Sequence, residues 1–236
     1  MCQLITEQGP LKQLALPLLC DMAHNVGSRR VRDELWEHNT VEFYFTILSE
    51  HYWKIHALNS ISMWCVWVYE MCACASHHRS HMSTDNPRDS IRSLQHDADR
   101  VQDVMLRPPN ITAIITLFRT PQRSVFESLL APLQSMIERS PELARSLGNS
   151  LFVAELVHRL EDNKAIVLTS LLKMLLCVFE ASSRSWDMIV EYSLLAVVSR
   201  FARNNRMVVV QGIARRLLDS FKPVVIARVS SSLSWS

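Results

Sequence analysis

The chain has 236 residues, of which 48% are apolar and 20% charged, and it contains only four glycines. This length suffices for one large domain or for a repeat array with a continuous core. Few glycines among plentiful Leu, Val, Ala and Met favour an α-helical protein, because each glycine costs a helix about 1 kcal/mol. The longest apolar run, from Ile61 to Ala75, contains Glu70 and is shorter than a membrane span.

The net charge of +2 conceals a gradient along the chain. From Arg184 to the end there are eight Arg or Lys residues and three acidic residues. This basic end indicates either an acidic partner or an ordinary solvated helix face. The first residues, MCQLITEQGPLKQ, show no signal-peptide pattern, and the six cysteines follow no disulfide spacing. We therefore expect reduced cysteines, with Cys20 and Cys177 in the core.

Long helices with broad apolar faces recur at a nearly constant interval. They are predicted to begin near Pro10, Tyr52, Gln122, Lys164 and Met207, in steps of 42, 70, 42 and 43 residues. Seventy equals 42 plus an insertion of 28, and a period near 42 is typical of armadillo and HEAT repeats. Pro17 and Pro132 fall inside long helices, which a solenoid tolerates because such bends contribute to its curvature.

Shorter helices are predicted in pairs ahead of the long ones. The pairs cover residues 28–39 with 40–50, 140–149 with 151–163, and 184–193 with 194–205. A short, a middle and a long helix in this order form the three-helix armadillo repeat. No stretch of the sequence alternates between apolar and polar residues as a β-strand would. The predicted fold is all-α, an armadillo/HEAT-like α-solenoid of about four three-helix repeats, forming one domain over residues 1–236. We expect the insertion at about 76–106, polar at first and helical from Asp89 with Asn86-Pro87 as a start signal, and a disordered tail at about 224–236.

The stretch CVWVYEMCACASHHRSH, residues 65–81, gathers cysteines and histidines at the end of the second long helix. Cys65 and Cys72 are predicted to be core residues on its buried side. A zinc site is one alternative, with ligands drawn from Cys74, His77, His78 and His81, and with His96 as a further candidate. The other alternative is a solvent-facing helix end, because no Cys-x-x-Cys pair anchors a site. We adopt the second interpretation and predict neither a metal nor a cofactor.

Catalytic motifs are absent from the sequence. A protein kinase needs a glycine-rich loop, but the four glycines lie far apart. The string HRLEDN at residues 158–163 resembles a kinase catalytic loop, but Leu160 replaces the essential Asp. No P-loop, Gly-x-Ser-x-Gly or His-Glu-x-x-His occurs. The chain is therefore predicted not to be an enzyme by itself, and the basic end lacks the interleaved aromatics that nucleic-acid binding requires.

With catalysis and nucleic-acid binding disfavoured, the sequence favours a protein-binding surface. We expect it on the third helices, because these line the concave face of armadillo arrays. Its predicted contact residues are Trp53, Lys54, His56, Asn59, Arg123, Glu127, Lys173, Gln211, Arg215 and Arg216. Trp53, Arg123 and Arg215 are the firmest candidates, since Trp and Arg anchor many interfaces. Packing between repeats is the alternative role for Trp53. Arg29, Arg30 and Arg32 form a second candidate basic cluster.

Three segments resemble one protein family: LPLLCDMAH at residues 16–24, LWEHNTVEFYFTILSEHYWKIHALNSISMW at 35–64, and LFVAELVHRLEDNKAIVLTSLLKMLLCVFEA at 151–181. They are similar to the armadillo-type region that follows the catalytic domain in fungal septation-initiation and mitotic-exit kinases and in plant MAP triple kinase epsilon. The resemblance covers about residues 12–222. Asn59 departs from it, where the family commonly has Asp, and so does the longer segment 70–100.

The resemblance implies a non-catalytic part of a serine/threonine kinase that works in the cytoplasm and at the spindle pole body during cytokinesis. Its implied partners are a Ras-like septation-network GTPase and a coiled-coil spindle-pole scaffold, with no nucleic acid and no membrane. Homodimerisation is left open. A generic armadillo peptide-binding adaptor is the alternative. It would need Trp and Asn on successive third helices, and only the second repeat supplies both, as Trp53 and Asn59.

Overall fold

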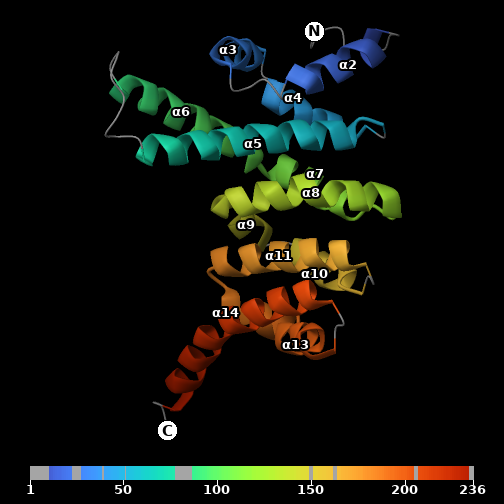
Figure 1. The fold of residues 1–236 in the computed structure, drawn as a ribbon, viewed down its shortest axis with the longest axis vertical. Coiled ribbons are helices and arrows are strands. Elements are labelled where there is room, and N and C mark those ends of the chain that lie inside the picture. The colour runs from blue at the N-terminus through green and yellow to red at the C-terminus, as the bar shows by residue number, and fades with distance from the viewer. Residues whose placement is uncertain are drawn as a thin grey trace. The chain divides into compact units, whose positions relative to one another are not determined.

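A computed structural model describes residues 11–22, 28–38, 40–50, 52–77, 87–148, 151–161, 164–204 and 207–233. Every regular element within these ranges is a helix (Figure 1). The chain divides into two compact units, residues 1–140 and 141–236. None of the described helices has the length and apolar character needed to cross a bilayer.

In the described residues of the first unit, the helix α2 precedes two three-helix repeats. Its helices are α2 (Leu11–Met22), α3 (Arg29–Glu37), α4 (Thr40–Ile47), α5 (Lys54–His77), α6 (Pro87–Met105), α7 (Pro108–Phe118) and α8 (Arg123–Arg139). Each repeat ends in a long third helix, α5 or α8, and these two helices pack against each other. Figure 1 shows that both run in the same direction.

The second unit contains two further repeats of the same plan. Its helices are α9 (Pro141–Gly148), α10 (Phe152–Arg159), α11 (Ala165–Ala181), α12 (Ser185–Glu191), α13 (Leu194–Asn204) and α14 (Val208–Leu233). All five predicted long helices are confirmed, as α2, α5, α8, α11 and α14, and so are the six shorter helices predicted in pairs. Pro17 and Pro132 lie inside α2 and α8 as expected, and Pro223 lies inside α14.

Aromatic rings hold the first unit together. Trp36 of α3 and Trp64 of α5 are both buried, with ring centroids 4.8 Å apart. The guanidinium of Arg100, on α6, stacks 4.2 Å above the Trp36 ring. The Tyr44 hydroxyl, on α4, donates a 2.7 Å hydrogen bond to the Leu19 carbonyl. One buried cluster thus joins α3, α5 and α6, while Tyr44 ties α4 to α2.

The second unit is built around α11, which packs on α9 and α14. Phe179 of α11 and Phe221 of α14 are buried against each other, with ring centroids 4.6 Å apart. Gly148 ends α9 close to α11, and a Cβ placed there would lie 3.2 Å from Val178 Cγ1. The absence of a side chain at Gly148 therefore allows the two helices to approach closely.

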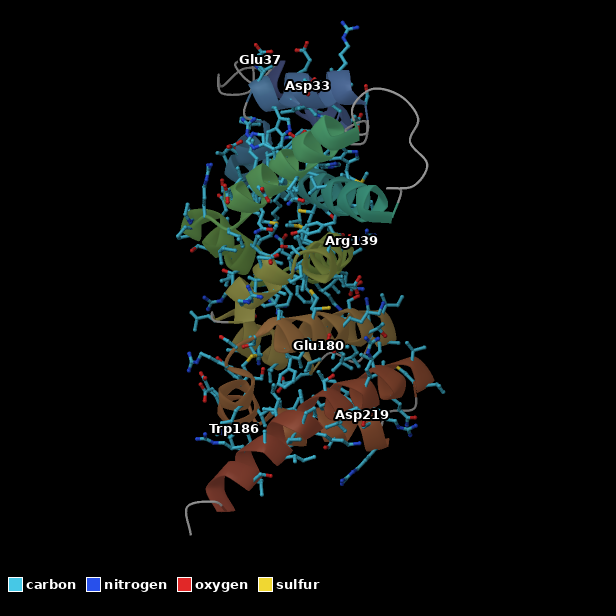
Figure 2. The ribbon with its side chains drawn as sticks, turned by 90° about the vertical axis from the view of Figure 1, so that its left-hand side faces the viewer. Asp33, Glu37, Arg139, Glu180, Trp186 and Asp219 are labelled. Atoms are coloured by element: carbon cyan, nitrogen blue, oxygen red, sulfur yellow. The ribbon has the colours of Figure 1, made fainter. Side chains whose placement is uncertain are left out.

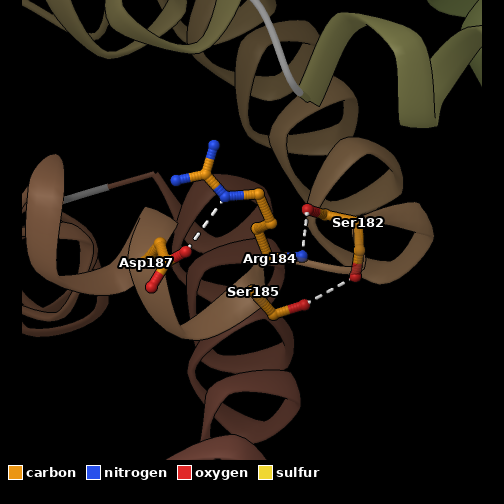
Figure 3. Close-up of polar contacts among 4 residues, drawn as sticks. All are labelled: Ser182, Arg184, Ser185 and Asp187. Atoms are coloured by element: carbon orange, nitrogen blue, oxygen red, sulfur yellow. Dashed lines mark hydrogen bonds and ion pairs between the residues drawn. The ribbon is translucent and has the colours of Figure 1, made fainter.

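The corner between α11 and α12 is closed by serine side chains (Figure 3). The Ser182 hydroxyl accepts a 3.0 Å hydrogen bond from the Arg184 backbone N–H, and the Ser185 hydroxyl donates a 2.9 Å bond to the Ser182 carbonyl. Arg184 Nε also donates to Asp187 Oδ2 at 3.0 Å. Local side-chain bonds of this kind satisfy the backbone groups where a helix stops.

The structure corrects three details of the prediction. The expected disordered tail is helical as far as Leu233, with Val224 and Val225 half-buried. The helix expected from Asp89 within the insertion is confirmed as α6, but this helix is the first of the third repeat, packs against α5 and is followed by α7, so it is not an addition to the repeat plan. Cys177 is half-buried instead of forming part of the core.

Other cysteine predictions are confirmed or fall outside the description. Cys20 and Cys65 are buried as expected. Burial raises the pKa of both thiols, and that of Cys65 reaches about 12. The side chains of residues 71–77 and all of residues 78–86 lie outside the described residues, so Cys72 and the proposed zinc ligands there do too. Among described residues His96 is exposed on α6, and no cluster of His, Cys, Asp or Glu suited to a metal occurs.

Candidate interaction surface

A single stripe of α11 escapes burial in the second unit. Apart from Ala165 and Ala181 at its ends, the residues of α11 that are not buried are Ile166, Thr169, Lys173, Cys177 and Glu180. Their spacing of three and four residues places them on one face of the helix. Counting 42 residues forward gives Val208, Gln211, Arg215, Asp219 and Lys222 on α14, and none of these is buried. We call these ten residues the unit 2 stripe.

Lys173 and Arg215 occupy equivalent places in this stripe. Each lies six residues before a phenylalanine of the contacting pair, Phe179 or Phe221. Figure 1 shows α11 and α14 running in the same direction, and the two helices pack on each other, so the two cations occupy equivalent positions on adjacent helices. The axes of packed helices are usually about 8–10 Å apart, so we expect about this distance between the axes of α11 and α14.

The two ends of the unit 2 stripe differ in chemistry. At the helix starts, Ile166 and Val208 leave 81% and 80% of their surfaces exposed. At the other end lie acids, Glu180 and Asp219, which Figure 2 labels on α11 and α14. The Ser220 hydroxyl donates to Glu180 at 3.3 Å, and Lys222 Nζ donates to Asp219 at 2.6 Å. The acids thus have partners at their own end, while Lys173 and Arg215 lie between the two ends of the stripe.

The corresponding stripe of the first unit is acidic. It consists of His56, Asn59, Met63, Trp67 and Glu70 on α5, and Ser124, Glu127, Ala131, Ser135 and Glu138 on α8. Glu70 forms a 3.0 Å ion pair with Arg139, which Figure 2 labels, and Glu127 forms a 3.1 Å pair with Arg123. The predicted residues His56, Asn59 and Glu127 therefore lie on the unit 1 stripe.

Trp53, Lys54 and Arg123 are close to the start of this stripe without belonging to it. Trp53 precedes α5, is half-buried, and its ring centroid lies 5.5 Å from that of His56. Lys54 begins α5 and is also half-buried, while Arg123 is exposed at the start of α8. Trp53 thus packs on a neighbouring residue of its own repeat and stays partly exposed, and its role in partner contact or in packing between repeats stays a prediction.

The remaining predicted residues lie elsewhere. Arg216 is exposed next to Arg215 but points about 100° away around the helix. Arg30 is exposed on α3, in the other unit from Lys173 and Arg215. The side chains of Arg29 and Arg32 are outside the described residues.

A groove of about 810 Å³ lies beside the unit 1 stripe. It is lined by the end of α4, the start of α5, and α7 with the turn that follows: Phe45, Leu48, Ser49, Lys54, Pro109, Thr112, Ala113, Thr116, Leu117, Arg119, Thr120 and Pro121. We call it the α4–α7 groove. Of its lining residues, sequence reasoning singled out only Lys54. The spacing of Thr112 and Thr116 was a signal that α7 presents a polar face there, and Thr120 follows in the turn after the helix.

A smaller hollow of about 310 Å³ lies at the α11–α12 corner of the second unit. It is lined by Gly148, Leu151, Arg184, Asp187, Met188, Glu191 and Tyr192. Burial, with a hydrogen bond to Glu191, raises the pKa of Tyr192. The hollow contains both acidic residues, Asp187 and Glu191, and the basic residue Arg184, which forms an ion pair with Asp187. It therefore favours neither a positively nor a negatively charged partner.

These repeats define an armadillo-type α-solenoid. No family model matches the chain. Among solved structures, an engineered protein superposes with a TM-score of 0.56 at 15% identity, covering 94% of this chain and 95% of its own. A designed armadillo repeat protein in complex with the peptide (KR)4 superposes with a TM-score of 0.54 at 12% identity, covering 93% and 98%. The predicted fold class is thereby confirmed.

Sequence comparison then places the chain among relatives of three kinds. It is 29% identical to the cytokinesis protein sepH of Aspergillus terreus over 92% of its length, and 30% identical to MAP3K epsilon protein kinase 1 of Arabidopsis thaliana over 80%. It is 23% identical to cell division control protein 7 of Schizosaccharomyces pombe over 93%. The chain spans only 14%, 12% and 18% of these proteins. It is thus homologous to a segment of each, which confirms the resemblance seen in the sequence.

Proposed function

We propose that this chain is a non-catalytic protein-interaction domain of a septation or cytokinesis signalling kinase. In this proposal it binds a Ras-like small GTPase, a coiled-coil spindle-pole scaffold or both, and so localises and activates the kinase at the spindle pole body. The homology to cytokinesis and cell-division proteins supports the process, and the armadillo-type fold supports a binding role.

The row of Lys173 and Arg215 is the observation that carries the proposal. Two cations at equivalent repeat positions, next to exposed Ile166 and Val208, offer charge and apolar area on one surface. Interfaces commonly combine an apolar centre with charges that select the partner. The designed armadillo relative holds a peptide of Lys and Arg, whereas the Lys173–Arg215 row calls for carboxylates on the partner.

The test is a pull-down with the purified 236-residue chain. The baits are the candidate GTPase, loaded with GDP or with a non-hydrolysable GTP analogue, and the coiled-coil scaffold. We expect retention of at least one bait, and at least tenfold weaker binding for the Lys173→Glu/Arg215→Glu variant. Arg200→Glu/Arg203→Glu is the matched control, because it makes the same charge change on the exposed face of neighbouring α13. The proposal is contradicted if the chain retains neither the scaffold nor the GTPase, with the GTPase tested in both nucleotide states.

A further inference from the structure

The exposed side of α13 carries a shallow hollow of about 480 Å³. Its described lining consists of Leu195, Ala196, Ser199, Arg200 and Arg203, which we call the α13 patch. Spacings of one, three and four residues put all five on one face of the helix. The hollow arises because Ala196 and Ser199 are small and lie between the longer side chains of that face.

The other face of α13 fixes the helix to the second unit. Leu194 and Val198 are fully buried, and Phe201 and Ala202 keep only 7% and 9% of their surfaces exposed. Because α13 packs on α12 and α14, this face is the one turned toward the core. The α13 patch is thus presented by a helix that is already ordered, which lowers the entropic cost of binding.

The two arginines of the α13 patch carry charge that is not taken up within the described part of the chain. The guanidinium of Arg200 lies 5.2 Å from the ring centroid of its neighbour Phe201, and it forms no hydrogen bond or ion pair with a described residue. Arg203 likewise has no such partner among the residues described. Like charges three residues apart on a helix repel each other, so a bound anion would relieve an unfavourable interaction.

The acids of the basic end are engaged elsewhere. Asp187 pairs with Arg184 at 3.0 Å, and Asp219 pairs with Lys222 at 2.6 Å. Glu191 lines the corner hollow on the α12 side. The described lining of the α13 patch contains no carboxylate of its own. The charge of the patch is therefore available to a partner, and it favours an anionic one.

We infer that the α13 patch binds an acidic amphipathic helix of a partner protein. An apolar side chain of that helix contacts Leu195, which is 41% exposed, above the small Ala196, and its carboxylates pair with Arg200 and Arg203. A helix suits the patch because both surfaces then repeat at about 5.4 Å per turn, so their contacts stay in register. This surface goes beyond the proposed function, because it shares no residue with the unit 2 stripe.

The probe is a fluorescein-labelled, Ala-rich peptide of about 20 residues, long enough to be helical in water, with Leu and Glu on one face. It is titrated with the full chain and followed by fluorescence anisotropy. We expect saturable binding that weakens as the salt concentration rises, because exposed charges are screened. Arg200→Glu/Arg203→Glu should weaken binding at least tenfold, and this variant should instead prefer a peptide with Lys in place of Glu.

The shape of the hollow is tested by Ala196→Trp, which should weaken binding of the peptide by filling the space between the longer side chains. Ala131→Trp is the matched control, because it makes the same change at an exposed position of α8 in the other unit. Lys173→Glu/Arg215→Glu makes the same charge change elsewhere in the second unit and should leave peptide affinity unchanged. Thermal unfolding of each variant establishes that it is folded.

Several outcomes would overturn the inference. These are absence of saturable binding, equal binding of a peptide with Gln in place of every Glu, and equal binding by Arg200→Glu/Arg203→Glu. Equal binding of a peptide with Leu and Glu on opposite faces would also overturn it, because charge attraction alone would then explain the result. Retention by phosphatidylserine vesicles without peptide binding would indicate a membrane surface and would overturn it too.

The inference and the proposed function fail separately. Arg200→Glu/Arg203→Glu should lose the peptide and still retain the GTPase or the scaffold. Lys173→Glu/Arg215→Glu should show the reverse. Loss of both activities in either folded variant would show that the two surfaces are not independent and would overturn the assignment of the peptide to the α13 patch.

Discussion

The rings of Phe179 on α11 and Phe221 on α14 meet edge to face, with centroids 4.6 Å apart and planes inclined by 62°. The two residues are 42 positions apart, which is the repeat length read from the sequence. This contact fixes which residues of α11 and α14 become neighbours, and so it aligns Lys173 with Arg215. The packing of the core thereby sets the order of charges on the surface.

Phe221→Ala should lower the free energy of unfolding by about 3–5 kcal/mol. The side chain is fully buried, so its removal loses apolar burial, leaves a cavity and removes the ring contact with Phe179. Urea denaturation followed by circular dichroism measures the loss. Val229→Ala, on the same helix but 51% exposed, should change stability by less than about 0.5 kcal/mol. Equal effects of the two changes would contradict the assigned packing.

Gly212→Ala should stabilise the protein by about 0.5–1 kcal/mol. Gly212 lies inside α14, and a Cβ at this position would meet no atom within 4 Å. Alanine therefore gains helix propensity and reduces the entropy of the unfolded chain without a clash. Gly148→Ala is the matched control, because its Cβ would lie 3.2 Å from Val178 Cγ1 and should gain less or destabilise. Thermal melts of both variants report the difference, and a stabilisation by Gly148→Ala as large as that by Gly212→Ala would be inconsistent with the packing of α9 on α11.

Stability should fall at alkaline pH because of Cys65. Its thiol is fully buried and lies 3.5 Å from Met105 Sδ, and burial raises its pKa from 9.0 to about 12. The folded protein thus keeps this proton at a pH where the unfolded chain releases it. The contribution of the protonated Cys65 thiol to the free energy of unfolding is fully present below pH 9.0. It is lost as pH rises toward 12, by up to about 1.4 kcal/mol per pH unit.

The measurement is the free energy of unfolding in urea on both sides of pH 9.0. Cys65→Ala should lower stability at neutral pH but flatten its decline above that point. The decline should not vanish, since burial raises the pKa of Cys20 in the same direction. An unchanged slope in Cys65→Ala would show that this thiol does not titrate as described.

Arg100→Ala should lower stability by about 0.5–2 kcal/mol. The guanidinium lies 4.2 Å from the Trp36 ring centroid, and Nη2 is 3.5 Å from the Trp36 carbonyl oxygen, so one side chain links α6 to α3. A double-mutant cycle with Trp36→Leu should give a coupling of at least about 0.5 kcal/mol. Gln95→Ala, at an exposed site on α6 whose amide donates to Asp99 at 3.1 Å in the same helix, should show no coupling with Trp36.

Some structural features were predicted correctly from the sequence and others were not. The long-helix starts were predicted well because apolar residues at helical spacing must be buried, and Pro, Ser and Asn interrupt them at fixed intervals. The tail at about 224–236 was expected to be disordered, but α14 continues through it as far as Leu233. Cys177 was assigned to the core although it belongs to the unburied stripe of α11, a distinction of about 100° around one helix.

The α4–α7 groove could not be predicted from the amino-acid sequence. Lys54 and Arg119 are 65 positions apart and belong to different repeats. The tertiary packing, which includes the ring contact of Phe118 with Phe126, brings α7 and Arg119 to the same hollow as Lys54. The sequence indicated exposed cations, and the tertiary contacts decided which of them share a site.

By itself, the sequence determined the helical class, the repeat of about 42 residues and the relationship to cytokinesis proteins, because periodicity and similarity are properties of residue order. The tertiary structure alone decided that Phe179 packs on Phe221 and that Lys54 and Arg119 line the same groove. The physical reason is that neighbouring helices contact along one face each. Which face that is depends on side-chain packing between residues that lie dozens of positions apart.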